Sequence, residues 1–285
     1  MGLSLQTPFI HLIIFASALA ATVSGYGFVL VASPLLLLLL PPAEAVPLSI
    51  LLGWTVPLIL LTRGAWRYVA RGYAFRLVAA GLPGIPLGAY LLFTLPPLLL
   101  RVLLGLVVAV IATVNLRSAG GQVGGSGAPP PAGGSEGGAF RWVGRSAANR
   151  ARGSGEAQCP PATATTSLFG FAGGIMSGAA GLSGPFMTLY LSRFPLSKHH
   201  LRATTASTIL MLSSVTLTVY AASGRIPPDL ARTALSLLPA LALGMLAGGR
   251  LFGALPELRF RQVTLGFAAL AGLGTALAAV SSARS

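Results

Sequence analysis

Residues 170–185 read Gly-Phe-Ala-Gly-Gly-Ile-Met-Ser-Gly-Ala-Ala-Gly-Leu-Ser-Gly-Pro, a run in which glycine recurs within apolar sequence. They lie inside residues 164–192, an uncharged block that is longer than the roughly 20 residues of one membrane-spanning helix. Residues 8–40 form a second block of this kind, with a break at Ser24-Gly-Tyr-Gly27. We expect each block to fold either as two short half-helices or as one helix followed by a re-entrant arm.

The composition of the whole chain is that of a membrane protein. Of its 285 residues, 54% are apolar and 8% are charged, whereas a soluble domain carries about 25% charged residues. Long apolar runs without strand alternation predict helices, because a helix satisfies its own backbone hydrogen bonds in lipid. The sequence therefore predicts an all-α, polytopic integral membrane protein with about eight transmembrane helices. The apolar blocks are residues 8–40, 45–62, 75–93, 97–116, 164–192, 203–221, 231–254 and 262–280.

The two halves of the chain share landmarks in the same order. Gly27 aligns with Gly181, and further matches are Arg76 with Arg232, Pro83 with Pro239, Gly88 with Gly244, Leu95-Pro96 with Leu255-Pro256, and Arg101 with Arg261. We therefore predict two homologous repeats, residues 1–117 and 163–285. Internal duplication is typical of secondary transporters, whose sites lie at the repeat interface near the middle of the bilayer.

Residues 118–162, between the repeats, are predicted to be a flexible linker. They contain the run GGQVGGSGAPPPAGGSEGG, and glycine, serine and proline cannot build a core. The run is followed by Arg141, Arg145, Arg150 and Arg152. We favour a solvated positive flank for this cluster, and binding of anionic lipid headgroups is the alternative.

Several kinds of chemistry are excluded by composition. Cys159 is the only cysteine, which excludes a disulfide framework and a thiolate metal cage. With three histidines, five acids and no HExxH, GxSxG or P-loop motif, we predict no enzyme activity, no cofactor and no metal site. Most of the net charge of +14 lies between apolar blocks, which indicates membrane topology rather than a nucleic-acid partner. No lysine or arginine precedes Arg63, so the first block is predicted to be retained rather than cleaved as a secretory signal.

Residues 170–185, followed by Arg202-Ala-Thr-Thr-Ala-Ser207, resemble the second-half signature of the sulfite exporter TauE/SafE family. The first half resembles the partner unit at Gly25-Tyr-Gly27, Pro34-Leu-Leu, Glu44-Ala-Val46 and Gly81-Leu-Pro-Gly-Ile-Pro-Leu-Gly88. The resemblance implies a polytopic membrane protein with two repeats. It also implies a permease for sulfite, sulfoacetate or a related small anion.

The first half departs from the family pattern at one point. The first repeat of the family usually carries a glycine run, roughly GxGGG, after its break, whereas this chain has Gly27-Phe-Val-Leu-Val31. Three bulky residues in place of the run predict that one half of a paired glycine site is filled or reshaped. This departure favours an alternative function, a non-transporting membrane protein of the same fold that acts as a binding or assembly partner.

The glycine breaks are the predicted substrate site. An anion that leaves water needs replacement donors, and a broken helix supplies free backbone N–H groups and the positive end of a helix dipole. Glycine allows close approach to the backbone, and serine hydroxyls add donors. The candidates are Ser177, Gly178, Gly181, Ser183 and Gly184 in the second half, and Gly25 and Gly27 in the first. The alternative is that small residues only allow close helix packing, which fits the four-residue spacing of Gly170, Gly174 and Gly178.

Residues 198–208 add polar candidates beside this site. Arg202 precedes Thr204 and Thr205 at the predicted start of a helix, where the cation would attract an anion and the hydroxyls would receive it. The alternative for Arg202 is interfacial snorkelling. Glu44 is a candidate for proton coupling, although a helix start alone also favours an acid.

We predict a permease that moves a small anion, such as sulfite, an organosulfonate or a related sulfur oxyanion, by alternating access at the repeat interface. The predicted partners are this substrate and the lipid bilayer, and the predicted location is the plasma (inner) membrane. Eight crossings with a cytoplasmic amino terminus would place 12 Lys/Arg inside and 7 outside. Four crossings per unit predict parallel repeats. If the two broken blocks return to their own side, each unit has three crossings and the repeats are inverted.

Overall fold

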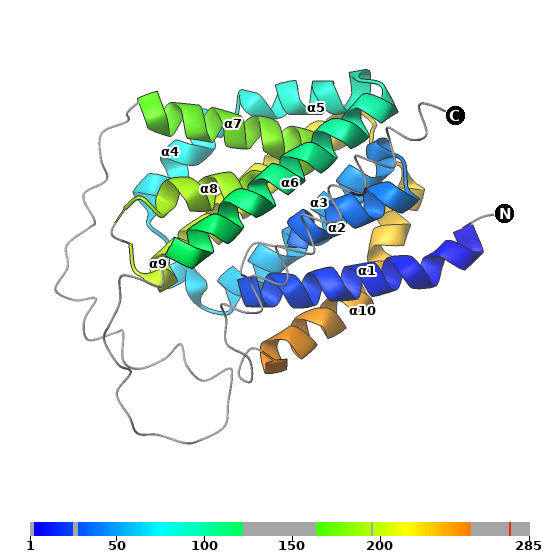
Figure 1. The fold of residues 1–285 in the computed structure, drawn as a ribbon, viewed down its shortest axis with the longest axis horizontal. Helices are drawn as coiled ribbons and strands as arrows, with labels where there is room; N and C mark the ends of the chain where they lie inside the picture. The colour runs from blue at the N-terminus through cyan, green and yellow to red at the C-terminus, as the bar shows by residue number, and fades with distance from the viewer. Residues whose placement is uncertain (1–2, 25–27, 122–163, 195, 252–273, 275–285) are drawn as a thin grey trace.

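The computed structural model describes residues 3–24, 28–121, 164–194, 196–251 and 274, and within them it is helical and contains no strand (Figure 1). This confirms the all-α prediction. The helices are α1 (Leu3–Ser24), α2 (Phe28–Leu39), α3 (Pro42–Thr62), the 3-10 helix η1 (Ala65–Tyr68), α4 (Arg71–Gly81), α5 (Gly84–Thr94), α6 (Pro97–Gly121), α7 (Ala164–Ala180), α8 (Ser183–Leu191), α9 (Lys198–Ala222) and α10 (Pro228–Leu251).

Three of the described helices are long and apolar enough to cross a membrane, namely Pro42–Thr62, His199–Ala222 and Pro228–Arg250. A fourth candidate is the pair α4 and α5, which bends by 46° at the Gly81–Gly84 junction. Shorter apolar helical stretches are Pro8–Thr22, Phe28–Leu39 and Pro97–Val110. The predicted last block, residues 262–280, lies outside the described residues.

One end of the bundle, which we call the His199 end, is where η1 meets the start of α9. The Tyr68 ring lies 5.8 Å from the His199 ring, and the Ala70 N–H donates to the Thr204 hydroxyl at 2.9 Å. Since η1 follows α3 and precedes α4, the end of α3 and the start of α4 lie here as well.

The opposite end, which we call the Glu44 end, holds the starts of α3, α6 and α10. Arg101, near the start of α6, donates to the Leu40 carbonyl at 3.5 Å, just before α3 begins. The ends of α5 and α9 also meet here, with the Phe93 and Tyr220 rings 5.2 Å apart. Thus α3 and α9 cross the bundle in opposite directions.

The block 164–192 folds as a helix with a returning arm, which decides between the two predicted forms. After α7 the chain turns at Gly181, and α8 runs back along α7, so that the Tyr190 and Thr166 hydroxyls are 2.6 Å apart. Gly173 lies against the Met187 side chain, which occupies the space that a Cβ would need. The hairpin α7–α8 therefore enters from the His199 end and returns to it.

The pair α1 and α2 has the opposite orientation. α1 runs parallel to α10, because Gly244 packs on Phe15 and Gly248 packs on Leu19, and α10 begins at the Glu44 end. α2 begins beside Gly53, in the middle of α3, and ends at the Glu44 end. α1–α2 thus starts from the Glu44 end and returns to it. α1, α3 and the pair α4 and α5 therefore run in the opposite direction to α7, α9 and α10, respectively.

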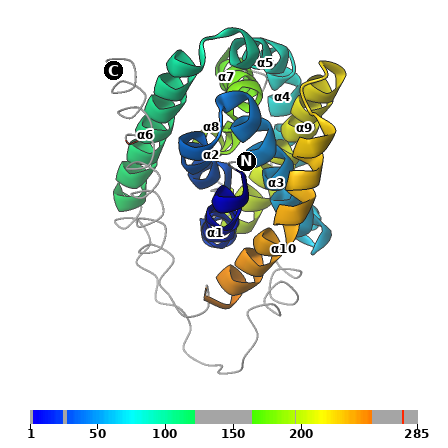
Figure 2. The same cartoon turned by 90° about the vertical axis from the view of Figure 1, so that its right-hand side faces the viewer.

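The two halves of the chain interlock through small residues. In Figures 1 and 2, α4, α5 and α7 lie side by side on one side of the bundle, and α1 and α10 lie on the other. A Cβ at Gly88 would overlap the Ile175 carbonyl of α7, and a Cβ at Gly244 would overlap the Phe15 carbonyl of α1. Both glycines hold helices of different halves of the chain in close contact.

Candidate functional site

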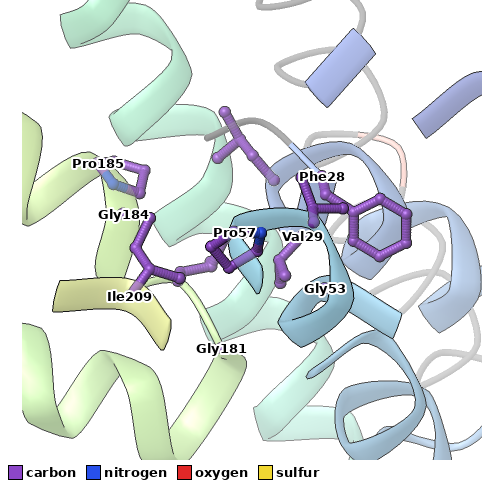
Figure 3. Close-up of a pocket in the computed structure, with 11 residues that line it drawn as sticks. Phe28, Val29, Gly53, Pro57, Gly181, Gly184, Pro185 and Ile209 are labelled. Carbon is purple, nitrogen blue, oxygen red and sulfur yellow. The ribbon is translucent and has the colours of Figure 1, made fainter. Parts of the chain in front are cut away.

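A cavity of about 30 Å³ lies where the first-half and second-half hairpins meet (Figure 3). One water molecule needs about 10–15 Å³ of such a volume, so the cavity holds roughly two water molecules. It is lined by residues of α2, α3, the α7–α8 turn, α8 and α9, which are Phe28, Val29, Leu30, Gly53, Val56, Pro57, Gly181, Leu182, Gly184, Pro185 and Ile209.

Two helix N-termini face this cavity. The first residues of α2, from Phe28 to Leu30, line one side, and Gly184 and Pro185 at the start of α8 line the other. The first N–H groups of a helix have no partner inside it, and each N-terminus carries roughly half a positive charge. The cavity therefore lies beside the positive ends of two helices within a mostly apolar wall. At the start of α8, Ser183 and Gly184 carry a first-turn N–H, whereas Pro185 has none.

Gly181 forms the turn between α7 and α8 for two separate reasons. Its φ is +70°, a left-handed conformation that costs other residues energy. A Cβ at this position would also lie 2.6 Å from the Ile50 Cγ1 atom and 3.2 Å from the Val29 Cγ1 atom. The N–H groups of Gly181 and Leu182 donate to the carbonyls of Ser177 and Met176 at 3.0 and 3.1 Å, which closes the end of α7.

The bulky residues of the first half are accommodated by Gly53 of α3. A Cβ at Gly53 would lie 2.7 Å from Val29 Cγ2 and 3.2 Å from Phe28 Cδ1. On the second-half side of the cavity the hairpin residue is small and the residue of the long helix is bulky, because Gly184 of α8 lies near Ile209 of α9 (Figure 3). Phe28 and Val29, which stand in place of the glycine run, thus occupy the first-half side of the cavity. On the second-half side the hairpin residue, Gly184, is small.

Ser177 and Gly178 hold α7 against α9 and do not line the cavity. The Ser177 Oγ and Thr216 Oγ1 atoms are 3.0 Å apart, and both residues are fully buried. The Tyr220 hydroxyl donates to the Gly178 carbonyl, and a Cβ at Gly178 would overlap the Ile85 carbonyl of α5. These contacts are the ones expected if Ser177 and Gly178 only allow close packing of the helices.

Ser183 and Thr205 are fully buried, and their hydroxyls have no hydrogen-bond partner among the described residues. Ser183 is the first residue of α8, beside the cavity-lining Leu182 and Gly184. An unpaired buried hydroxyl costs free energy, so Ser183 offers a donor beside the positive end of α8. Thr204 has a different role, because its hydroxyl accepts the Ala70 N–H at the start of α4.

The charged candidates lie at the ends of the bundle. Arg202 is exposed and donates to the Thr22 carbonyl in the last turn of α1 at 3.1 Å, a favourable position for a cation. Glu44 is exposed in the first turn of α3. Gly25 and Gly27 lie outside the described residues.

Sequence reasoning did not identify Gly53, Pro57 and Ile209 as lining residues. Gly53 lies within an apolar block. The number of positions between Gly53 and Ile209 equals the number between Gly88 and Gly244. The repeat alignment could therefore have paired these two positions, although their approach to the hairpins depends on the tertiary structure. Among the described residues, no three or more His, Cys, Asp or Glu side chains form a group that could hold a metal ion.

The family model described as Sulfite exporter TauE/SafE matches residues 10–275, nearly the whole chain. The chain belongs to the sulfite exporter TauE/SafE family. Neither a curated protein nor a solved structure gives a significant match. TauE/SafE proteins are polytopic membrane transporters of sulfur anions, so this member is an integral membrane protein of the transporter class, which agrees with the prediction that it is not an enzyme. The resemblance found in residues 170–185 and 202–207 is thereby confirmed.

Proposed function

We propose that this TauE/SafE protein is a permease for a small sulfur oxyanion or organosulfonate, and that the substrate binds at the cavity between the hairpins. The observation that carries the proposal is the meeting of two helix N-termini, those of α2 and α8, at one cavity. Broken helices in transporters bind anionic groups in this way.

The binding chemistry follows from the lining. An anion entering the membrane must replace its water with other donors, since an unsatisfied charge in an apolar medium is very costly. The first-turn N–H groups of α2 are such donors, and in α8 those of Ser183 and Gly184 are, because Pro185 has no N–H. The buried hydroxyl of Ser183 is a further donor. Gly184 has no side chain to cover the backbone at the start of α8, whereas the Gly181 N–H already donates to the Ser177 carbonyl.

Alternating access is supported by the way in which the helices associate. α1 of the first hairpin packs on α10, whereas α7 of the second hairpin packs on α4 and α5, and α3 and α9 lie between the two groups (Figure 2). Each group combines a hairpin of one half with a crossing helix of the other. Rocking of one group against the other around the cavity would expose it to either side of the membrane in turn.

One observation favours the second candidate, a non-transporting binding or assembly partner. Phe28 and Val29 occupy the first-half side of the cavity and leave about 30 Å³. If the hairpins do not separate, no sulfur oxyanion fits in a space of about two water molecules.

Flux of sulfite and of short organosulfonates into proteoliposomes distinguishes the two candidates. A permease gives saturable flux, and Gly184→Leu abolishes it while membrane insertion is retained, because the new side chain takes space at the cavity. Gly249→Leu in α10 is the matched control, since no atom lies within 4 Å of a Cβ there. Flux through Gly184→Leu equal to that of the parent would remove the cavity from the pathway. An inactive parent with every anion would favour the binding partner.

A further inference from the structure

The His199 end of the bundle carries most of the cations of the described residues and neither of their acids. Glu44 and Asp229, the two acids in the described part of the chain, lie in the first turns of α3 and α10 at the Glu44 end. The cations of the His199 end include Arg63, Arg67, Arg71, Arg193, Arg202 and Arg250. An excess of cations on one side is typical of membrane topology, and it gives the His199 end a positive potential toward the leaflet that it meets.

Trp66 and Arg71 meet on the surface of this end, in a segment that we call the Trp66 corner (residues 66–71). Trp66 of η1 is 58% exposed, and the Arg71 Cζ atom lies 4.6 Å from the centroid of its ring. Arg67 and Arg71 are exposed as well. The helix dipole disfavours a cation at the first residue of α4, so helix stability does not explain Arg71. An indole at the level of the headgroups with guanidinium groups in the same segment is suited to a lipid phosphate.

An exposed apolar stripe begins one helical turn after Arg71. Steps of four residues place Arg71, Phe75 and Ala79 on one face of α4, and all three are exposed. The opposite face of α4 is buried, because the helix packs on α7 and α9. The exposed side chains that continue from Arg71 along α4 and α5 are Phe75, Ala79, Leu82, Leu87 and Tyr90.

The length of α4 matches one leaflet of a bilayer. At a rise of 1.5 Å per residue, Leu82 lies roughly 16 Å beyond Arg71 along the helix. Half of the hydrocarbon core of a bilayer is about 15 Å thick, and the 46° bend between α4 and α5 follows at this depth. A lipid whose headgroup lies at Arg71 can therefore extend an acyl chain along α4 as far as the bend.

We propose that the Trp66 corner binds an anionic glycerophospholipid. Its phosphate lies at Arg67 and Arg71, and one acyl chain follows α4 past Phe75. Charge complementarity selects this occupant, because the cationic group of a zwitterionic lipid finds no carboxylate among the described residues at this end. The phosphate of an anionic lipid compensates the guanidinium groups, which can each donate two hydrogen bonds to it. The inference concerns a surface outside the cavity and does not depend on the proposed transport.

The test measures quenching of Trp66 fluorescence by lipids brominated on the acyl chain. The full chain is placed in phosphatidylcholine nanodiscs with increasing fractions of brominated phosphatidylglycerol or brominated phosphatidylcholine, and the Trp66→Phe variant gives the signal of the other tryptophans. We expect phosphatidylglycerol to reach half-maximal quenching at a mole fraction at least tenfold lower, since each nearby arginine contributes about fivefold. Equal quenching by the two lipids would overturn the inference.

Arg71→Gln distinguishes a lipid site from general attraction to an anionic surface. This variant should lose about fivefold of the preference for phosphatidylglycerol. Arg250→Gln is the matched control, because Arg250 is exposed at the same end, whereas α10 lies on the opposite side of the bundle from α4 (Figures 1 and 2). The control should retain the preference of the parent. Equal losses in the two variants would show surface attraction alone and overturn the site.

Two further measurements complete the test. Size-exclusion profiles compare the folding of the variants, and Arg71→Lys replaces a poorly folded Arg71→Gln. Lysine keeps the charge but cannot donate in the paired geometry of a guanidinium group, so Arg71→Lys should lose part of the preference. Free glycerophosphoglycerol, which lacks acyl chains, should leave the quenching unchanged. Displacement of the brominated lipid by this soluble headgroup would overturn the assignment of a lipid as the occupant.

Discussion

The turn at Gly181 can be tested by adding a single methyl group. Gly181→Ala places a Cβ at φ +70°, which costs about 1–2 kcal/mol in the left-handed conformation. The same Cβ lies 2.6 Å from the Ile50 Cγ1 atom, and overpacking of a well-packed core costs typically about 1–3 kcal/mol. We therefore expect a loss of about 2–5 kcal/mol in the free energy of unfolding. The measurement is equilibrium unfolding in mixed micelles.

Gly224→Ala separates the two contributions. Gly224 has nearly the same φ, +66°, but nothing lies within 4 Å of its Cβ position, so this variant should lose only the conformational part, about 1–2 kcal/mol. Ile50→Ala in the Gly181→Ala background should recover part of the packing loss, which gives a favourable coupling energy in a double-mutant cycle. Equal losses for Gly181→Ala and Gly224→Ala would refute the contact between the hairpin turn and α3.

Three further variants test other contacts. Tyr220→Phe removes the hydrogen bond to the Gly178 carbonyl and leaves that acceptor buried, so we expect a loss of about 1–3 kcal/mol in unfolding free energy; a change below 0.5 kcal/mol would contradict the bond. Gly244→Ala should destabilise by about 1–3 kcal/mol through overlap with α1, whereas Gly249→Ala in the same helix should stabilise by up to about 1 kcal/mol, and a reversed order in thermal unfolding would contradict the packing of α10 on α1. Arg202→Gln should lower Tm slightly and leave the half-saturating substrate concentration unchanged, because the side chain binds the end of α1; a marked rise in that concentration would return Arg202 to the substrate site.

Much of the fold could be predicted from residue types alone. A chain with 8% charged residues cannot cover a soluble surface, and long apolar runs must be helical because lipid offers the backbone no hydrogen bonds. The break after Ala180 was also predictable, since Gly181 and the following Ser-Gly-Pro disfavour a continuous helix. The sequence predicts Gly88 and Gly244 as matched positions of two repeats, but it does not indicate which residues they contact.

The return of each hairpin to its own side was beyond the reach of the sequence. Lipid tails and buried side chains are equally apolar, so hydropathy does not distinguish a helix that crosses the membrane from one that turns back inside the protein. The direction of α8 depends on contacts with residues about 14–24 positions away, such as Met187 with Gly173 and Tyr190 with Thr166. Only the packed structure contains those contacts.

The candidate site, like the fold, could be predicted from the sequence only in part. Residue type alone predicted Gly181, Ser183 and Gly184 as substrate contacts, because glycine and serine at a helix break can leave donors accessible. Their grouping with Val29 and Ile209 required the two hairpins to meet, and these residues come from opposite halves of the chain. Local sequence determines where a helix must break, whereas the free energy of close packing between distant segments determines which breaks face each other.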